Sequence, residues 1–237
     1  MITVKDLVKE YNQRVVLDIE SLQINEGELF GLVGNNGAGK TTFFRLLLDL
    51  IRASKGNIHS NENDVSASET WKDYTSSYLD ESFLIGFLTP YEYFHFIGET
   101  YGFSKADIDH KLLDYKSFLT EEIVNEKKKY IRDFSKGNKQ KIGIVSSIIT
   151  EPKVLVLDEP FDGLDPTSQI LLKRLLVKLN AQTKATILIS SHDLNHVTEV
   201  CPRIVLLEKG KVLRDITNNP NTLAELELYF APDKILE

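Results

Sequence analysis

The chain has 237 residues, of which 42% are hydrophobic and 27% charged, a composition typical of a soluble globular protein with one large domain or one domain plus a sub-domain. Its 28 basic and 35 acidic side chains give a formal net charge of −7, which argues against a surface built mainly to bind nucleic acid. The single cysteine excludes an internal disulfide and fits a reducing cytosol. No signal peptide and no apolar window of ~18 residues is recognisable, so no membrane span is expected.

The N-terminal part is predicted to form β-strands. The segments ITVKDLVKEY (2–11) and RVVLDIESLQI (14–24) have strand character, and the polar pair Asn12 and Gln13 predicts a turn between them. The apolar segment ELFGLV (28–33) then reads as a short buried strand.

A glycine-rich stretch, GLVGNNGAGKTTFF (31–44), follows and is the strongest signal in the sequence. Its residues 34–41 fit the phosphate-binding pattern G-x-x-x-x-G-K-[ST]. A helix is indicated directly afterwards by apolar residues at helical spacing, namely Phe43, Phe44, Leu47, Leu48 and Ile51. A glycine loop at a helix N-terminus offers backbone N–H groups and the positive end of the helix dipole to an anion. Lys40 can reach the outer phosphates and Thr41 can bind Mg²⁺; a chance glycine-rich turn is the disfavoured alternative.

The middle of the chain changes character twice. Residues 56–80 are polar and rich in Ser and Asn, which predicts loops around short strands, whereas residues from about 89 to 147 have helical character. Alternating strands and helices then return. We therefore expect an α/β fold with a mostly parallel sheet, an N-terminal antiparallel β portion and an inserted helical sub-domain. The expected single domain spans 1–237, with 1–80 and 150–237 as the core and 81–149 as the sub-domain.

The C-terminal third supplies three further elements. The segment TSQILLKRLLVKL (167–179) is predicted to be an amphipathic helix, capped by Asp165 and with Pro166 in its first turn. ATILISSHD (185–193) is predicted to contain a buried strand. RIVLLEKGKVLRD (203–215) is predicted to form a hairpin that turns at Lys209–Gly210.

Two adjacent acids stand at the end of the predicted buried strand 154–157. Ligands of open α/β sheets bind at the carboxyl ends of the strands, so Asp158 is placed to orient the shell of a Mg²⁺ ion. Glu159 could accept a proton from an attacking water. Alone, such acids are more often solvent-facing, but the phosphate loop favours a catalytic role. Together the two motifs predict phosphoryl transfer to water.

The segment FSKGNKQKIGIVSSII (134–149) offers a second helix N-terminus. Ser135, Gly137 and Asn138 supply a hydroxyl and backbone donors, which makes this a second potential anion site. The simpler alternative is that Ser135 only caps the helix. Two phosphate-binding elements far apart in sequence would be explained if each completed a site on another subunit.

In their order and spacing, these motifs resemble those of the nucleotide-binding subunit of ATP-binding cassette (ABC) transporters, over essentially the whole chain. GNNGAGKT resembles the Walker A loop and VLVLDE the Walker B strand, and FSKGN occupies the place of the signature usually written L-S-G-G-Q. GLD (163–165) matches the D-loop, and SSHD carries the switch histidine, His192. Tyr11 lies where the family has an aromatic residue that stacks on adenine.

The resemblance implies a head-to-tail dimer, of two copies or of two related chains, with two ATP molecules between the subunits. Thr41 and Asp158 would bind Mg²⁺, Glu159 and His192 would be catalytic, with His192 sensing the γ-phosphate, and Asp165 would relay between the sites. From one subunit each nucleotide would contact Tyr11, Gly34, Asn35, Asn36, Gly37, Ala38, Gly39, Lys40, Thr41 and Thr42. From the other it would contact Ser135, Gly137 and Asn138.

The sequence departs from the family pattern at two places. Lys136 replaces the first glycine of the signature, and Asn138 replaces its glutamine. The Q-loop, which normally offers a glutamine to Mg²⁺, reads SYLDESF here and leaves Asp80 or Glu81 in that role.

Three expectations concern the surface. Eight aromatic residues between 83 and 103 are predicted to be mostly core, with some exposed for a partner, since the family's permease inserts a short helix near this region. The basic segment 126–141 is predicted to be a solvated face. His196, one turn after the switch histidine, is predicted to lie on the surface.

The leading functional hypothesis is a cytoplasmic ATPase subunit, peripheral on the inner face of the cell membrane, that powers a separately encoded permease. SKGNKQK resembles the signature variant of exporters of drugs, peptides or antibiotics. The alternative is a soluble ABC-type ATPase that acts on ribosomes, DNA or a regulatory partner, although no nucleic acid is expected. A third hypothesis, a module that binds ATP without useful turnover, is disfavoured by the presence of both Glu159 and His192.

Overall fold

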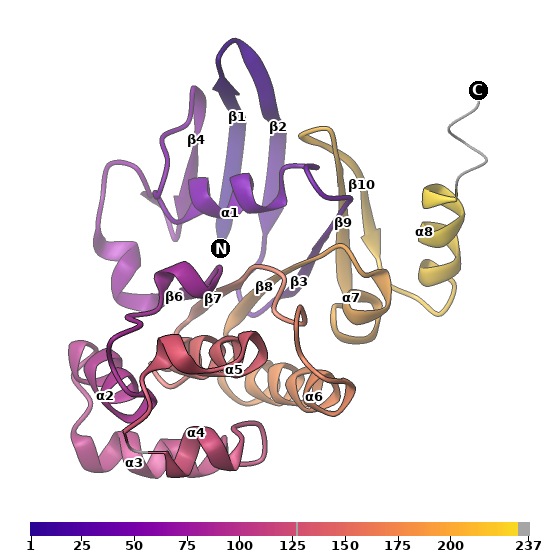
Figure 1. Cartoon of the computed structure of the whole chain (residues 1–237). Coiled ribbons are helices and arrows are strands. Elements are labelled where there is room, and N and C mark those ends of the chain that lie inside the picture. Colours follow the sequence, from indigo (N-terminus) through magenta and orange to yellow (C-terminus); the bar gives the residue numbers. More distant parts are fainter. Residues whose placement is uncertain (127, 232–237) are drawn as a thin grey trace.

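The N-terminal layer is an antiparallel sheet (Figure 1), seen in a computed structural model that describes residues 1–126 and 128–231. Its strand order is β2-β1-β4-β5. The strands are β1 (Ile2–Tyr11), β2 (Arg14–Ile24), β4 (Lys55–Ser60) and β5 (Asn63–Asp64). Asn12 and Gln13 have φ values of 48° and 65°, as a two-residue hairpin turn with a right-handed twist requires. The two predicted strands and the turn between them are confirmed.

The second sheet has the order β10-β9-β3-β8-β7-β6. The carboxyl ends of its parallel strands lie at one edge of the sheet. Its strands are β3 (Leu29–Val33), β6 (Thr75–Tyr78), β7 (Val154–Leu157), β8 (Thr186–Ser191), β9 (Arg203–Glu208) and β10 (Lys211–Thr217). All pairs are parallel except β9–β10, the predicted hairpin, which turns at Lys209 and Gly210. Every residue of β3, β7 and β8 is buried, as expected for parallel strands covered on both faces.

Helices lie on both faces of this second sheet and beside it, and the first of them lies on the face toward the antiparallel sheet (Figure 1). They are α1 (Lys40–Leu47), α2 (Pro90–Thr100), α3 (Lys105–Asp114), α4 (Glu121–Asn125), α5 (Lys136–Ile148), α6 (Pro166–Thr183), α7 (Leu194–Val200) and α8 (Thr222–Phe230). Short 3₁₀ turns span η1 (Thr70–Tyr74), η2 (Glu81–Phe83) and η3 (Ile131–Asp133). The predicted cap of α6 is confirmed, because the Asp165 side chain accepts a hydrogen bond from the Ser168 N–H at 2.9 Å. Helix α1 is shorter than predicted: it ends at Leu47, and Asp49 follows with φ 50°.

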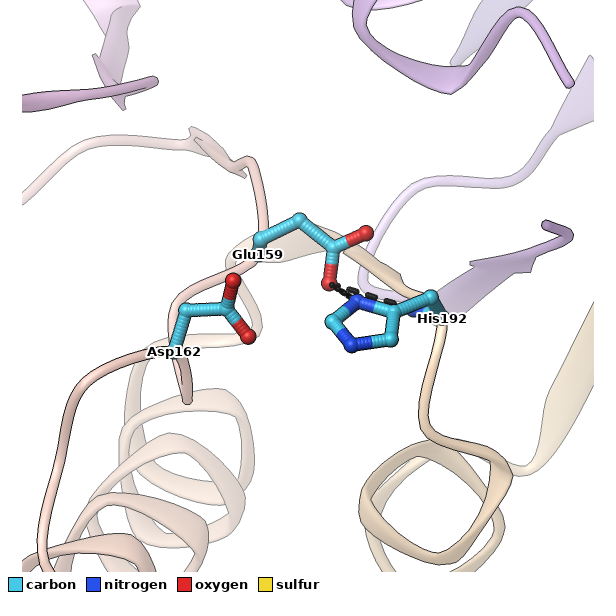
Figure 2. A group of neighbouring side chains, drawn as sticks. All are labelled: Glu159, Asp162 and His192. Atoms are coloured by element: carbon cyan, nitrogen blue, oxygen red, sulfur yellow. Dashed lines mark hydrogen bonds and ion pairs between the residues drawn. The ribbon is translucent and has the colours of Figure 1, made fainter. Parts of the chain in front are cut away.

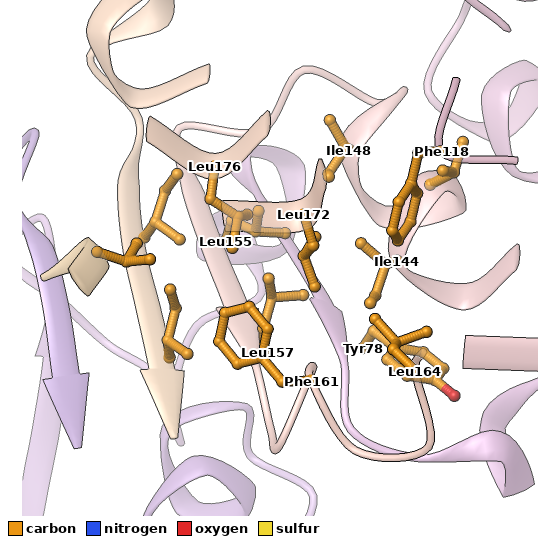
Figure 3. Close-up of a cluster of buried hydrophobic side chains, with 14 of the residues drawn as sticks. Tyr78, Phe118, Ile144, Ile148, Leu155, Leu157, Phe161, Leu164, Leu172 and Leu176 are labelled. Carbon is orange, nitrogen blue, oxygen red and sulfur yellow. The ribbon is translucent and has the colours of Figure 1, made fainter. Parts of the chain in front are cut away.

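Two buried clusters occupy the two faces of the central sheet. Phe30 and Leu32 of β3 face the antiparallel sheet together with Phe43 and Phe44 of α1, in one cluster. The residues that alternate with them along the strands belong to the other cluster, under the helices (Figure 3). Leucines of β7 there join Leu172 and Leu176 of α6 and residues of α5. The layers are therefore an antiparallel sheet with α1, the central sheet, and a helical layer, which confirms the predicted fold class.

One of the glycines before the phosphate loop has a packing role. A Cβ atom at Gly31 would lie 2.1 Å from Cγ1 of Val197, so only glycine lets α7 approach β3 this closely. Gly31 therefore belongs to the core contact between α7 and β3, and the loop itself begins at Gly34.

The aromatic segment is more exposed than predicted. Tyr93 and Phe94 are buried and Phe103 is partly buried, but the others are exposed: Phe83, Phe87, Tyr91, Phe96 and Tyr101. The prediction of a mostly buried set was wrong: α2 covers only part of its surface with α3, α4 and α5, which leaves Tyr91 and Phe96 exposed, and the remaining exposed aromatic residues lie outside that helix.

Two surface predictions also change. His196 is packed and not on the surface: its side chain is 14% exposed and its ring centroid lies 4.6 Å from that of Phe161. Burial lowers the pKa of His196. In the basic segment 126–141, residue 127 lies outside the described residues, and Lys141 is buried. The end of the expected domain, 232–237, also lies outside them. In the part of the chain that is described, no helix combines the length and apolarity needed to cross a membrane.

Candidate functional site

Three adjacent parallel strands end at the same edge of the central sheet and bring the predicted motifs together. Strand β3 leads into the glycine loop, β7 into Asp158 and Glu159, and β8 into His192. Because β8 lies between β3 and β7, the three segments converge, although more than a hundred residues separate the glycine loop from the other two in sequence. The convergence is the carboxyl-edge arrangement expected for ligand sites of open α/β sheets.

The glycine loop has a backbone that side chains would not permit. Gly34 has φ 158° and Gly39 φ 111°, and a Cβ atom at Gly34 would lie 2.3 Å from the carbonyl oxygen of Leu207. Gly39 is also the N-cap of α1, where no side chain caps the helix. The first N–H groups of α1 are thus left for an anion. An open cavity of about 360 Å³ is lined by Val16, Asn36, Gly37, Ala38, Gly39, Lys40, Thr41, Thr42 and Glu159.

Lys40 is held by groups of the protein itself. Its ammonium donates to the carbonyl oxygen of Gly34 at 2.6 Å and lies 3.1 Å from Oε1 of Glu159. The lysine is only 6% exposed, so the ion pair is weakly screened by solvent. A phosphate that binds Lys40 must therefore compete with the Glu159 carboxylate.

Asp158 and Thr41 form a pair of oxygen ligands beside the loop. The Thr41 hydroxyl donates to Oδ2 of Asp158 at 2.6 Å, and the Ser190 hydroxyl donates to Oδ1. Burial raises the pKa of Asp158 and the neighbouring Glu159 adds to this, against the hydrogen bonds from Ser190 and Thr41. A buried carboxylate next to a hydroxyl suits the oxygen preference of Mg²⁺, so the two residues fit the metal predicted for them.

Glu159 lies beside His192 (Figure 2). Oε2 of Glu159 accepts a hydrogen bond from the His192 N–H at 3.1 Å and lies 3.0 Å from its Nδ1. Glu159 has φ 46°, a left-handed conformation that costs roughly 1–3 kcal/mol in a residue with a side chain. Its N–H donates to the Ser190 hydroxyl at 2.9 Å, which helps to hold it. The two predicted catalytic residues are therefore direct neighbours.

Asp162 joins this pair and was not identified from the sequence. Its carboxylate, that of Glu159 and the His192 ring offer ligand atoms that all lie within 4.8 Å of one another (Figure 2). A set that contains an imidazole suits a transition metal better than Mg²⁺, so it does not replace Thr41 and Asp158 as the predicted magnesium ligands.

The signature segment forms the start of α5. The Ser135 hydroxyl accepts from the Asn138 N–H at 3.3 Å, so Ser135 does cap the helix. A Cβ atom at Gly137 would lie 2.7 Å from the carbonyl oxygen of Gly163, which shows that the signature packs directly on the D-loop. The amide of Asn138 donates to Oε2 of Glu122 at 2.7 Å, within the helical region. Contact between this amide and a nucleotide would require that bond to break.

Two further predicted residues lie at the margins of the site. Asp165 caps α6 and lies 3.8 Å from the Lys141 ammonium, and hydrogen bonds from Ser168 lower its pKa. Tyr11 ends β1, is 47% exposed and has the Lys9 ammonium 4.6 Å from its ring centroid. Val16, and not Tyr11, lines the cavity at the loop, so adenine stacking on Tyr11 stays a prediction.

The two Q-loop candidates point to different elements. Asp80 accepts from the Ser82 N–H at 2.8 Å and lies 4.0 Å from the Arg45 guanidinium of α1. Glu81 forms an ion pair of 3.2 Å with Lys139 of α5. Asp80 therefore faces the phosphate-loop helix and Glu81 the signature helix.

Sequence reasoning missed two residues that hold the segment containing Asp158 and Glu159. Ser190 bonds both Asp158 and the Glu159 N–H, and the Gln140 amide donates to the Glu159 carbonyl oxygen at 3.1 Å. Ser190 lies within the SSHD segment, which could have singled it out. No pattern in the sequence indicates a role for Gln140, because its contact with Glu159 depends on how α5 packs against β6 and β7.

The glycine loop at a strand–helix junction and the acidic pair at the end of a neighbouring strand define a P-loop nucleotide-binding protein. Residues 17–162 match the family model described as ABC transporter, and the chain belongs to this family as an ATP-binding subunit.

Relatives and solved structures agree with this assignment. An uncharacterized ABC transporter ATP-binding protein of Methanocaldococcus jannaschii is 36% identical over 213 residues, which cover 90% of this chain and 76% of the relative. The bacitracin transport ATP-binding protein of Enterococcus faecalis is 30% identical over 218 residues, 91% of this chain and 69% of the relative. An ATP-binding cassette solved as a dimer in a post-hydrolysis state with ADP and phosphate superposes with a TM-score of 0.82. It is 22% identical, and the match covers 92% of this chain and 99% of that structure, so it supports the fold alone.

Proposed function

We propose that this chain hydrolyses ATP as one of two cassettes in a dimer and thereby powers a separate membrane permease. The observation that carries the proposal is the placement of the Glu159 carboxylate between Lys40 of the phosphate loop and His192. A carboxylate at this position can act as the base for an attacking water.

Binding of ATP would rearrange this group. The phosphates bind the N–H groups of the loop and of the first turn of α1, and the Lys40 ammonium turns from Glu159 to the phosphate oxygens. Thr41 and Asp158 would hold Mg²⁺, which supplies positive charge that neutralises the phosphate oxygens. His192, freed from Glu159, can donate a hydrogen bond to the γ-phosphate.

Hydrolysis then requires one water and one proton transfer. Glu159 takes a proton from the water while the water oxygen forms a bond to the γ-phosphorus. The bond between the γ-phosphorus and the bridging oxygen breaks, and the products are ADP and inorganic phosphate. The electron pair of the broken bond stays on the ADP oxygen.

The dimer is proposed from the incompleteness of the site. The cavity at the loop is open, and the start of α5 lies outside the residues that line it. We expect Ser135 and Gly137 of one subunit, with Asn138, to meet the nucleotide of the other, and Asp165 to lie between the two sites. A cassette of the same fold was solved as a dimer with ADP and phosphate, and this is the precedent for the proposed dimer. The second subunit is another copy or a related chain.

The permease partner is supported by the exposed aromatic residues between 83 and 101 and by the transport role named for the bacitracin relative. Contiguous patches of exposed apolar side chains commonly mark an interface, and these aromatic residues are close together in sequence. The chain would then work in the cytoplasm, attached to the inner face of the membrane through that permease. Its signature variant and the bacitracin relative favour an exporter.

The decisive experiment is Glu159→Gln in the full chain. The variant should bind ATP, lose at least about a hundredfold in steady-state hydrolysis, because general-base catalysis contributes that much, and accumulate as an ATP-bound dimer. Phosphate release measures the loss of hydrolysis, and size-exclusion chromatography in the presence of ATP measures the ATP-bound dimer. Hydrolysis at the wild-type rate would refute the proposal.

Affinity capture separates the transport role from the alternative, an ABC-type ATPase that acts on ribosomes, DNA or a regulatory partner. Recovery of a membrane protein from detergent-solubilised membranes is the expected result. Recovery of ribosomes alone would exclude the transport role and leave the ATPase activity intact.

A further inference from the structure

We propose that Gln140 is a positioning residue for hydrolysis, which holds the Glu159 peptide and so links the signature helix α5 to the catalytic carboxylate. The inference rests on the proposed function, because it assigns Gln140 a part in the same reaction. Gln140 touches neither the cavity at the phosphate loop nor the ligand atoms around it, and it acts through Glu159.

The amide of Gln140 is fixed at both ends. The residue lies in α5 and is 6% exposed. Its Nε2 donates to the carbonyl oxygen of Glu159 at 3.1 Å, and its Oε1 accepts from the Tyr78 hydroxyl at 3.1 Å. A carbonyl oxygen can only accept, so the amide nitrogen must face Glu159 and the amide oxygen must face Tyr78. The flipped amide would place two acceptors against each other.

Tyr78 can reach Gln140 because its ring packs directly against helix α5. A Cβ atom at position 143 would lie 2.0 Å from Cε2 of Tyr78, so Gly143 is required for the ring to lie against the helix. Tyr78 belongs to the same buried cluster as Ile144 of α5 (Figure 3). Burial raises the pKa of the Tyr78 hydroxyl, which therefore stays protonated and able to donate.

The Glu159 backbone is held by side chains on both sides. Its N–H donates to the Ser190 hydroxyl of β8 at 2.9 Å, and its carbonyl oxygen accepts from Gln140 of α5. With φ at 46°, Glu159 occupies a conformation that needs such external support. Since the carboxylate projects from this peptide, rotation of the peptide would move it relative to Lys40 and the phosphate loop.

The position of Gln140 in α5 connects the signature residues to the Glu159 peptide. Gln140 follows the signature residues Ser135 and Gly137 by one turn of the same helix. A second contact runs in parallel, the ion pair between Lys139 and Glu81. A nucleotide that docks on the start of α5 and shifts the helix would thus move the Glu159 peptide through Gln140. The base would then be aligned when the signature is engaged.

The test is the steady-state kinetics of Gln140→Met, which keeps the volume and removes both hydrogen bonds. We expect kcat to fall about tenfold, a part of the hundredfold or more that a general base contributes, while the KM for ATP changes less than about twofold. Tyr78→Phe removes only the bond that orients the amide, and its kcat should fall about two- to threefold. If Gln140→Met does not fold, the kcat of Tyr78→Phe decides by itself.

A matched control and a second background separate positioning from packing. Ser147 is buried on the same helix and its hydroxyl bonds only within α5, to the Ile144 carbonyl, so Ser147→Ala should keep the wild-type kcat. In the Glu159→Gln background, with the base already removed, Gln140→Met should change the residual single-turnover rate less than about twofold.

Three results are decisive. A kcat of Gln140→Met equal to that of Ser147→Ala would overturn the role of Gln140 and leave the ATPase intact. An equal loss in the wild-type and Glu159→Gln backgrounds would also overturn it, because the defect would then be one of general packing. Wild-type hydrolysis by Glu159→Gln would instead refute the proposed function itself.

Discussion

The phosphate-loop side of this molecule and its signature side are built in different ways. Around the loop, Glu159 contacts both Lys40 and His192, and Asp158 accepts hydrogen bonds from Thr41 and Ser190, all within one chain. At the start of α5, the polar side chains bond within the helical region: Ser135 caps the helix, and Asn138 donates to Glu122. The first region is a nearly complete site without a partner. In the proposed dimer, the second would contact a nucleotide only on the other subunit, and in the single chain the start of α5 lies outside the residues that line the open cavity at the loop.

Among the variants that test this difference between the two sides, removal of Lys40 should have the largest effect, which is on ATP affinity. Lys40→Ala deletes the only loop ammonium that pairs with Glu159 among the described residues and leaves the Glu159 carboxylate without that partner. Affinity for ATP should fall by about a hundredfold or more, which corresponds to about 3 kcal/mol of lost charge-assisted hydrogen bonding. Calorimetric titration measures the loss. Unchanged affinity would show that the loop does not bind the phosphates through this lysine.

Ser135→Ala tests the signature side, where the expected effect is smaller on the single chain. Loss of the cap should reduce the free energy of unfolding by about 1 kcal/mol, measured by urea denaturation without nucleotide. If Ser135 also meets the nucleotide of a second subunit, hydrolysis should fall about tenfold while ATP affinity of the single chain stays the same. A stability loss with wild-type hydrolysis would reduce Ser135 to a helix cap.

Asp158→Asn should separate stability from function. Because burial raises the pKa of Asp158, the folded state binds its proton more tightly than the unfolded state does. The free energy of unfolding without Mg²⁺ should therefore fall as the pH rises through the window between the unfolded and folded pKa values. At neutral pH the uncharged asparagine does not carry the free-energy cost of burying a charged carboxylate.

The variant should thus be more stable than the wild type, by about 1 kcal/mol or about 2–4 °C in Tm. It should also lose Mg²⁺-dependent hydrolysis. Thermal unfolding at pH 5 and pH 8 gives the comparison, since the advantage of the variant should be greater at pH 8. A lower Tm of the variant at both pH values would contradict the burial argument.

Lys139→Ala should have the smallest effect. The ion pair between Lys139 and Glu81 is half exposed at the carboxylate, and such pairs contribute about 0.2–1 kcal/mol. We expect a change in unfolding free energy at the lower end of that range and a loss of hydrolysis smaller than that of Gln140→Met. A larger loss would assign the link between the Q-loop and the signature helix to this ion pair.

The sequence by itself determined the elements whose signal lies in neighbouring residues. The glycine loop is readable because φ values such as that of Gly39 exclude other residues, and the cap of α6 is readable because Asp165 bonds a backbone N–H three residues away. The buried strands and the acids that follow β7 are likewise contiguous. These signals arise from local backbone chemistry, which the order of residues contains.

Tertiary structure alone decided which distant side chains meet. The bonds of Gln140 and Ser190 to Glu159, the place of Asp162 beside His192 and the burial of His196 against Phe161 depend on how α5, β7 and β8 pack. Exposure of Tyr91 and Phe96 was misjudged for the same reason, since composition does not show which face of a helix packs against a neighbour. A residue's contacts across the fold are set by the shapes of whole elements, and no short stretch of sequence carries that information.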